Sequence, residues 1–300
     1  MARSDNLTGA LLMMASMAGF TFNDAAMKAM AGQVPLYQLL FLRGVLTTLA
    51  VLFLAWRMKA LAPRLPRRDK MLIGLRIVAE TGAAYFFLTA LFNMPIANVT
   101  AILQALPLTV TLVAALAFRE PVGWRRFLAI LAGFLGVLLI VRPGAEDFNA
   151  FSVYALMAVL CVTVRDLATR RLSSATPSIF VTLATSASIM AVFGLASLAA
   201  PWAAMGPREA GLTAFAALCI ICGYLCSIMV MRVGEISFVA PFRYTGLIWA
   251  LALGWIVFGE WPAWQTLLGA GIVAASGVFT LYREARLARR RPPLPTPHSR

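Results

Sequence analysis

Long apolar stretches separated by short polar segments run through the whole chain. A helix needs about 20 apolar residues to cross a bilayer, and ten stretches approach or exceed that length. They span residues 7–31, 36–56, 71–92, 96–118, 125–141, 151–170, 178–200, 210–231, 236–258 and 263–282. The pattern predicts an all-α integral membrane protein with ten transmembrane helices and no soluble domain. The first stretch is too long for a signal-peptide core, so we expect an uncleaved span.

Composition agrees with this pattern. Hydrophobic residues make up 61% of the 300 residues and charged residues only 13%, whereas an ordinary soluble protein is about 25% charged. The mean hydropathy is +0.83. The net charge of +14 reflects basic residues whose placement matters more than their number.

Basic residues are distributed unevenly between the two predicted faces of the membrane. With a cytoplasmic N-terminus, 20 of the 26 Lys and Arg fall on the cytoplasmic side, and only Lys28, Arg142 and Arg208 fall outside. Cytoplasmic loops typically carry such an excess, so we expect a cell (inner) membrane protein with both termini in the cytoplasm. The excess also favours anionic lipid in the inner leaflet, and no nucleic-acid partner is expected. The basic, Pro-rich segment 285–300 is expected to be a disordered tail.

The two halves of the chain repeat each other. Phe118, Glu120 and Trp124 match Phe258, Glu260 and Trp264 at a spacing of 140, and Pro35 matches Pro177 at 142. Each half holds five stretches, and an odd number inserts the second copy from the opposite side. We therefore predict inverted-topology repeats at residues 1–143 and 144–284, an arrangement that supports alternating access. With Glu120 inside and Glu260 outside, we interpret this motif as a marker of the repeat, not a solute site.

Several of the repeated segments also resemble a known family. The best-matching stretches are 101–110, 118–120, 133–137, 239–245 and 258–269. In order and spacing they resemble the drug/metabolite transporter superfamily, in its EamA-domain branch, over essentially the whole chain. The resemblance implies a ten-helix carrier for small metabolites, often amino acids, frequently in the export direction. The halves differ at two aligned positions: Leu247 stands in the second half where the first has Pro107, and Thr185 where the first has Arg43. The halves are therefore not expected to be equivalent.

Glu80 is the first candidate for solute recognition. A charge near the bilayer centre costs about 2.5–3.5 kcal/mol on insertion scales, and its repeat counterpart is Ile220. Arg76 lies one turn earlier on the same face, where an i, i+4 pair can form. The sequence leaves two interpretations: Glu80 binds a solute ammonium group or a coupling proton, or it forms a structural pair with Arg76 or Arg43.

Two further pairs are candidates for gates at helix ends. Asp24 and Lys28 recur as Asp166 and Arg170 at a spacing of 142. We expect each to be an i, i+4 ion pair. Exposed pairs of this kind are worth only about 0.3–0.5 kcal/mol, and because both halves keep the pair, a scaffold role is favoured over a gate.

The remaining candidates would line a central cavity. Gln104 precedes Pro107, which removes a backbone donor in mid-membrane, and Tyr244 occupies the equivalent position beside Arg243. Packing alone also explains each of these positions. Further aromatic and amide side chains are candidates on the same grounds: Phe20, Asn23, Tyr85, Asn98, Tyr154, Tyr224 and Trp249.

Other classes of function find less support. The sequence lacks a phosphate-binding Gly-x4-Gly-Lys-Ser/Thr motif and catalytic signatures, so direct ATP use and enzymatic activity are not expected. Cys219, Cys222 and Cys226 have no histidine ligand within a span, so no metal or cofactor is expected. We predict a secondary carrier for an amino acid or related metabolite. The open alternatives are an exporter of hydrophobic cations and a passive facilitator, and neither proton coupling nor a choice between monomer and homodimer follows from the sequence.

Overall fold

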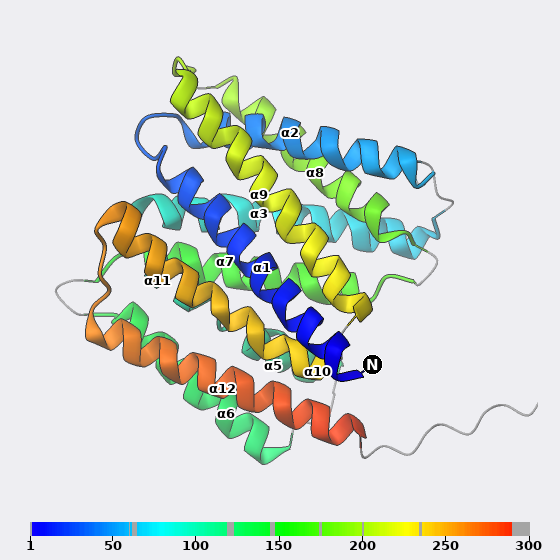
Figure 1. Cartoon of the computed structure of the whole chain (residues 1–300), viewed down its shortest axis with the longest axis vertical. Helices are drawn as coiled ribbons and strands as arrows, with labels where there is room; N and C mark the ends of the chain where they lie inside the picture. Colours follow the sequence, from blue (N-terminus) through cyan, green and yellow to red (C-terminus); the bar gives the residue numbers. More distant parts are fainter. Residues whose placement is uncertain are drawn as a thin grey trace, which may run out of the picture.

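Long helices account for almost all of the described chain. The computed structural model describes residues 2–59, 61, 65–118, 123–144, 148–173, 176–199, 201–233 and 236–289. Within these ranges the helices form a single bundle (Figure 1). The first half contains α1 (Ala2–Lys28), α2 (Leu36–Arg57), α3 (Arg67–Asn93), α4 (Ile96–Leu103), α5 (Leu106–Phe118) and α6 (Trp124–Val141). The second half contains α7 (Phe151–Arg170), α8 (Ser178–Ser197), α9 (Pro207–Val233), α10 (Ile236–Val239), the 3-10 helix η1 (Ala240–Tyr244), α11 (Thr245–Phe258) and α12 (Trp264–Arg289).

The helices have the length and polarity of membrane spans. Among the described residues, eight helical segments are long and apolar enough to cross a bilayer, and α6 holds a shorter apolar stretch, Phe127–Val141. The helix α1 is not among the eight, and it carries Asn23 and Asp24 within its apolar run. Large apolar side chains point outward from several helices, as on Val78, Leu116 and Leu195. An apolar surface of this kind suits lipid and not water, which confirms the predicted all-α membrane architecture.

Two predicted spans are interrupted at matching positions. The stretch 96–118 divides into α4 and α5 at Gln104 and Ala105, just before Pro107. The stretch 236–258 divides into α10, η1 and α11 around Pro241. Proline lacks the N–H that a helix needs and its ring crowds the preceding turn, which explains why both breaks lie beside one. Gln104 and Tyr244, which are 140 residues apart, therefore both lie at the end of an interrupted segment.

Helices from the two halves pack against each other in pairs. The helix α1 packs along α9, α3 along α7, α2 along α8, and α6 along α12. Glycines allow the backbones to approach closely, because a Cβ on Gly19 would lie 2.8 Å from the Cys219 carbonyl oxygen, and one on Gly136 would lie 2.8 Å from the Gly269 carbonyl oxygen. Ser16 Oγ donates a hydrogen bond of 2.8 Å to the Gly223 carbonyl. Small residues are the usual means of close helix packing in membranes.

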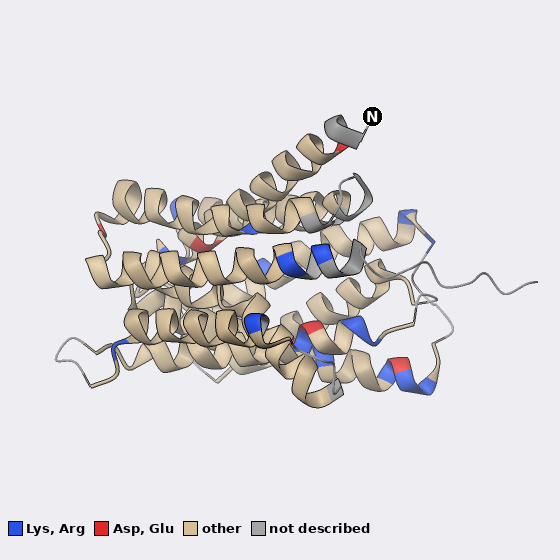
Figure 2. Cartoon of the chain, turned by 90° about the horizontal axis from the view of Figure 1, so that it is seen from below, with Lys and Arg blue, Asp and Glu red and all other residues tan. Residues whose placement is uncertain are grey.

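The two ends of the bundle differ in charge. At one end, here called the Lys28 end, Lys28 meets Met94 and Glu260. The opposite end, here called the basic end, holds Arg57 and Arg170. Figure 2 shows the described Lys and Arg gathered in the middle of the bundle and toward the basic end, with few at the Lys28 end. The described start of α1 and end of α12 also lie at the basic end.

Candidate functional site

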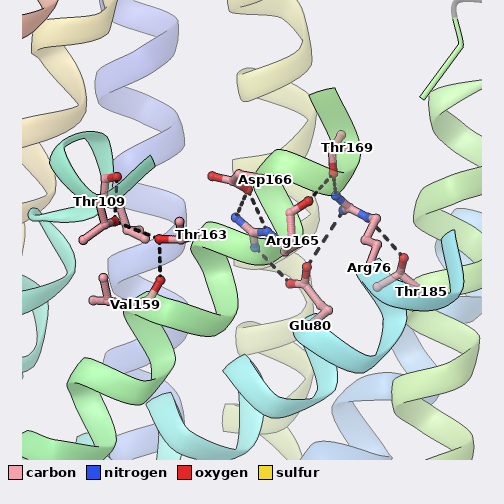
Figure 3. Close-up of polar contacts among 10 residues, drawn as sticks. Arg76, Glu80, Thr109, Val159, Thr163, Arg165, Asp166, Thr169 and Thr185 are labelled. Carbon is pink, nitrogen blue, oxygen red and sulfur yellow. Dashed lines mark hydrogen bonds and ion pairs between the residues drawn. The ribbon is translucent and has the colours of Figure 1, made fainter. Parts of the chain in front are cut away.

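Glu80 lies inside the bundle between two arginines. It projects from α3 toward α7, where its Oε1 lies 3.1 Å from Arg165 Nη1. Its Oε2 lies 3.9 Å from Arg76 Nη2. The expected i, i+4 pair of Arg76 and Glu80 is therefore present, but the shorter contact is to Arg165 on the other half of the chain (Figure 3).

Arg165 is held by a second carboxylate. Asp166 Oδ1 accepts from Arg165 Nε at 2.9 Å and from Arg165 Nη2 at 2.8 Å. This corrects two sequence expectations. Arg165, one of the 20 basic residues counted on the cytoplasmic side, lies within α7 and contacts Glu80 inside the bundle. Asp166 pairs with Arg165 instead of Arg170. The physical reason is that Glu80 attracts the Arg165 guanidinium into the bundle beside Asp166, while the Arg170 side chain stays exposed.

Arg76 connects three helices. Its Nη1 donates to the Thr169 hydroxyl on α7, and its Nε donates to the Thr185 hydroxyl on α8 at 3.4 Å. These hydroxyls accept from the guanidinium without neutralising it. Arg76 therefore keeps its charge available to Glu80 while its position is fixed by both halves.

A second polar group, on α1 and α2, extends this network. Arg43 Nη1 donates to Asn23 Oδ1 at 3.1 Å, and Asn23 Nδ2 donates to Asp24 Oδ1 at 2.9 Å. Arg43 also interacts electrostatically with Asp24 and Glu80. The ring of Phe20 packs edge-on against that of Tyr224 on α9, with centroids 5.2 Å apart. Tyr224 also interacts electrostatically with Glu80 and Arg165.

We call the six charged residues of this region the charge layer. Its members are Asp24, Arg43, Arg76, Glu80, Arg165 and Asp166. Three guanidinium groups face three carboxylates, so their formal charges cancel. Side-chain exposure rises from 13% at Glu80 to 24% at Arg165 and 34% at Asp166, so these three side chains are largely but not fully buried.

At the Lys28 end, Lys28 makes contacts that the sequence did not predict. Its Nζ lies 2.8 Å from Glu260 Oε1 and donates to the Met94 carbonyl at 2.6 Å. Glu260 Oε2 accepts from the Ile96 N–H at 3.1 Å. The prediction of an Asp24–Lys28 pair is therefore wrong. Lys28 is the last residue of α1, and its side chain extends toward the loops of the Lys28 end. Glu120, the repeat counterpart of Glu260, lies outside the described residues.

Residues at the two helix breaks lie apart from these contacts. Gln104 is buried and faces α11, where its Nε2 lies close to Gly246. Tyr244 is buried against Gly277 of α12, and its hydroxyl has no hydrogen-bond partner in the described chain. Arg243 is half-buried beside it.

The remaining candidates mostly make aromatic contacts. Tyr85 stacks on Tyr37 with centroids 6.3 Å apart, and Trp249 lies 6.1 Å from Phe22. Asn98 Oδ1 is buried without a hydrogen-bond partner among the described residues. Packing therefore accounts for Tyr85 and Trp249, while the Asn98 carbonyl oxygen keeps an unused acceptor.

Comparison with known proteins identifies the family to which this chain belongs. Residues 7–142 match the EamA-like transporter family. The chain is also 30% identical over 229 residues to the riboflavin transporter of Vibrio cholerae, a match that covers 72% of this chain and 73% of the relative. The chain belongs to the EamA-like transporter family. It is therefore a membrane transporter of the drug/metabolite transporter superfamily and not an enzyme, as the sequence resemblance implied.

Other matches cover similar or larger parts of this transporter. It is 27% identical to the S-adenosylmethionine uptake transporter of Rickettsia bellii, over 64% of this chain and 66% of the relative. It is 24% identical to the pseudopaline exporter CntI of Pseudomonas aeruginosa, over 88% of this chain and 93% of the relative. A solved structure described as "Crystal structure of protein" covers 94% of this chain with a TM-score of 0.62 and 18% identity, which supports the fold.

Sequence reasoning missed four polar partners in this transporter. Arg165 pairs with Glu80 across the halves, Thr169 and Thr185 accept hydrogen bonds from Arg76, and Glu260 pairs with Lys28. One signal was available for Arg165, which lies five residues inside the end of an apolar stretch, directly before Asp166. The two threonines carried no such signal, because a threonine in a membrane helix usually bonds only its own backbone.

Proposed function

We propose that this EamA-family transporter carries a small zwitterionic metabolite, an amino acid or an amino-acid-containing compound, by alternating access. The observation that carries the proposal is the charge layer, in which Arg165 of one half meets Glu80 of the other at 3.1 Å. A charge in a membrane is costly unless it has a partner or a task. Six charged side chains at the junction of two halves suit a solute that itself carries both signs.

The helix pairing supports an exchange between inverted halves. By the repeat spacing, α1 corresponds to α7 and α3 to α9. The pair α1–α9 and the pair α3–α7 are therefore counterparts, while α2–α8 and α6–α12 are each their own counterpart. A motion that opens one end by loosening one pair has an equivalent at the other end through its counterpart. Rocking of one repeat against the other around a fixed site is the usual form of alternating access.

The two ends support an assignment of the conformation. We take the basic end as cytoplasmic, by the positive-inside rule, and the Lys28 end as external. Lys28 and Glu260 join the external ends of α1 and α11, while exposure within the charge layer rises toward the basic end. We therefore infer an inward-facing state, in which solute enters from the cytoplasm. Glu80 is then the site for a solute ammonium group, and also the group that would take up a coupling proton.

The relatives' names support the solute class. They name riboflavin, S-adenosylmethionine and pseudopaline, all small organic metabolites, of which S-adenosylmethionine includes a methionine. The relatives comprise both an uptake transporter and an exporter. We favour export, because the exporter aligns with the largest share of this chain among these three and because the inward-facing state presents the charge layer to the cytoplasm.

Counterflow into proteoliposomes tests this proposal. Vesicles containing the purified transporter would be loaded with a mixture of amino acids and related metabolites, and exchange would be followed by mass spectrometry, with and without a pH gradient. We expect saturable, trans-stimulated exchange of zwitterionic solutes. Unsaturable flux would support a facilitator instead, and exchange restricted to hydrophobic cations would overturn the zwitterion assignment.

A further inference from the structure

Arg165 has the geometry of an exchangeable carboxylate site. One edge of its guanidinium is hydrogen-bonded to Asp166, because both Nε and Nη2 donate to Asp166 Oδ1. The remaining donor, Nη1, points to Glu80 Oε1 at 3.1 Å. Asp166 thus fixes the plane of the guanidinium without using the Nη1 edge. A planar guanidinium held in this way presents a preformed fork to a carboxylate.

Glu80 is a replaceable partner of that fork. Its second oxygen, Oε2, is buried without a hydrogen bond in the described structure and lies 3.9 Å from Arg76 Nη2, beyond hydrogen-bond range. A small movement of Glu80 toward Arg76 on the same helix would shorten this contact. Glu80 can therefore leave Arg165 without losing a cationic partner.

The balance of charge selects the chemistry of the incoming group. The charge layer is formally neutral, and a net charge added to a desolvated region is expensive. A carboxylate that takes Arg165 from Glu80 brings one negative charge, which an ammonium group on the same solute offsets beside the freed Glu80. An amine lacks the group that competes for Arg165, and a carboxylic acid without an amine leaves an uncompensated charge.

On the basis of the proposed carrier function, we propose that Arg165 binds the carboxylate of an α-amino-acid zwitterion by displacing Glu80, while Asp166 acts as its positioning residue. The resting Arg165–Glu80 pair is then the empty-site form of the transporter. The substrate carboxylate replaces Glu80 on Nη1, Glu80 moves toward Arg76, and the solute ammonium binds at Glu80. Phe20 and Tyr224, whose rings meet edge-on, border this region and favour an apolar or aromatic side chain on the solute.

The test compares solutes that differ only at the carboxyl group. Wild-type proteoliposomes would be assayed by counterflow with the twenty common amino acids, their C-terminal amides and their decarboxylated amines. We expect wild type to prefer acids over amides by roughly tenfold or more, as for a charge-assisted hydrogen bond. In Arg165→Gln this ratio should fall to near one. In Arg165→Lys, which keeps the charge but cannot hold Asp166 and a carboxylate as one fork, it should be intermediate.

Two further variants separate binding from positioning. Asp166→Asn should raise the KM for acids with little change in maximal exchange, because the guanidinium remains but is no longer held in plane. Arg170→Gln, on the exposed end of the same helix, removes the same charge outside the layer and should keep the wild-type ratio. Thermal unfolding in detergent checks that each variant is folded, and a variant that does not fold is replaced by Arg165→Met.

The outcomes distinguish the proposal from the function on which it rests. If wild type exchanges solutes but takes amides as readily as acids, or if a folded Arg165→Gln keeps the preference for acids, the assignment of Arg165 is wrong and the carrier function stands. If wild type exchanges none of these compounds, both are overturned.

Discussion

The Lys28 end and the charge layer use the same ion-pair chemistry in different ways. At the Lys28 end, each charged group also bonds the backbone: Lys28 donates to the Met94 carbonyl and Glu260 accepts from the Ile96 N–H. In the charge layer, the partners of Glu80 are side chains alone. A backbone partner ties an ion pair to a fixed scaffold, whereas a side-chain partner can be exchanged.

This difference suits the two regions to different roles. The Lys28–Glu260 pair joins the end of α1 to the α3–α4 and α11–α12 loops, and it can break only if these segments separate. A network with a loose contact at 3.9 Å and an unpartnered oxygen can change partners without moving a helix. The charge layer is therefore suited to recognition, and the Lys28 end to closure. The variants below test this distinction, in order of decreasing effect.

Replacement of Glu80 by leucine should have the largest effect. It leaves Arg76 without its carboxylate, and removal of one partner from a buried pair costs about 3–5 kcal/mol. We expect a clear fall in the unfolding temperature in detergent and loss of counterflow. The double variant Glu80→Leu/Arg76→Leu keeps the charge balance and the Arg165–Asp166 pair.

The double variant separates stability from transport. Because apolar residues often replace a buried pair at little cost, it should recover most of the unfolding temperature while transport stays absent. If the double variant regains transport, Glu80 is only a structural partner. Glu80→Gln serves as the isosteric control, and normal transport by this variant across pH would exclude both ammonium binding and proton coupling by Glu80.

Lys28→Met should open the Lys28 end without abolishing solute binding. The variant loses two charge-assisted contacts, each worth about 1.5–3 kcal/mol, so the ratio of closed to open forms should fall by roughly tenfold or more. Spin labels at Asn93 and Trp261, in a cysteine-free background, would report a longer distance by electron–electron resonance. The swap Lys28→Glu/Glu260→Lys should not restore closure. It places a carboxylate beside the Met94 carbonyl and an ammonium group beside the Ile96 N–H, so neither backbone hydrogen bond can form. Full rescue would show a simple charge pair.

The sequence predicted the scaffold better than the contacts. Apolar stretches gave the membrane helices, and Pro107 indicated an interruption that the structure places at Gln104 and Ala105. These features depend on local sequence. The repeat spacing pointed to Asp24 with Lys28 and to Asp166 with Arg170, and neither pair forms. A partner on another helix was closer in space, and spacing along one helix cannot reveal it.

The same limit explains which site residues were found. Glu80 and Arg43 stood out because a charge in an apolar stretch is costly wherever it lies. Arg165 was counted among the basic residues of the cytoplasmic side, and its partner Glu80, which is 85 residues away in the sequence, is revealed only by the fold. Tyr244 was matched to Gln104 by the repeat spacing, but its contact with Gly277 depends on how α12 packs. Polarity was readable from the chain, and pairing across the halves was not.

Gly269→Ala should lower stability while leaving both compared regions intact. A Cβ at this position would lie 2.5 Å from the Gly136 carbonyl oxygen and 2.8 Å from Ile140, so α6 and α12 must separate. Overpacking of this kind costs about 1–3 kcal/mol. We expect a lower unfolding temperature with an unchanged preference among solutes. Gly271→Ala is the matched control, because a Cβ there meets nothing within 4 Å. Equal effects of the two variants would contradict close packing of α6 on α12.

Gln38→Met should give the smallest effect and isolates the part that charge plays in closure. Gln38 lies near the start of α2, where its side chain donates to the Ala203 carbonyl at 2.9 Å and accepts from the Ala203 N–H at 2.9 Å. This neutral clamp joins the two halves through backbone contacts, as Lys28 and Glu260 do, but without ions. A neutral hydrogen bond contributes about 1 kcal/mol, so the distance between the spin labels at the Lys28 end should shift less than in Lys28→Met. The shift should also be insensitive to salt, whereas that of Lys28→Met should change with ionic strength. If both variants respond equally to salt, the ion pair contributes no more to closure than an uncharged clamp, and the distinction between the two regions rests on their backbone anchors alone.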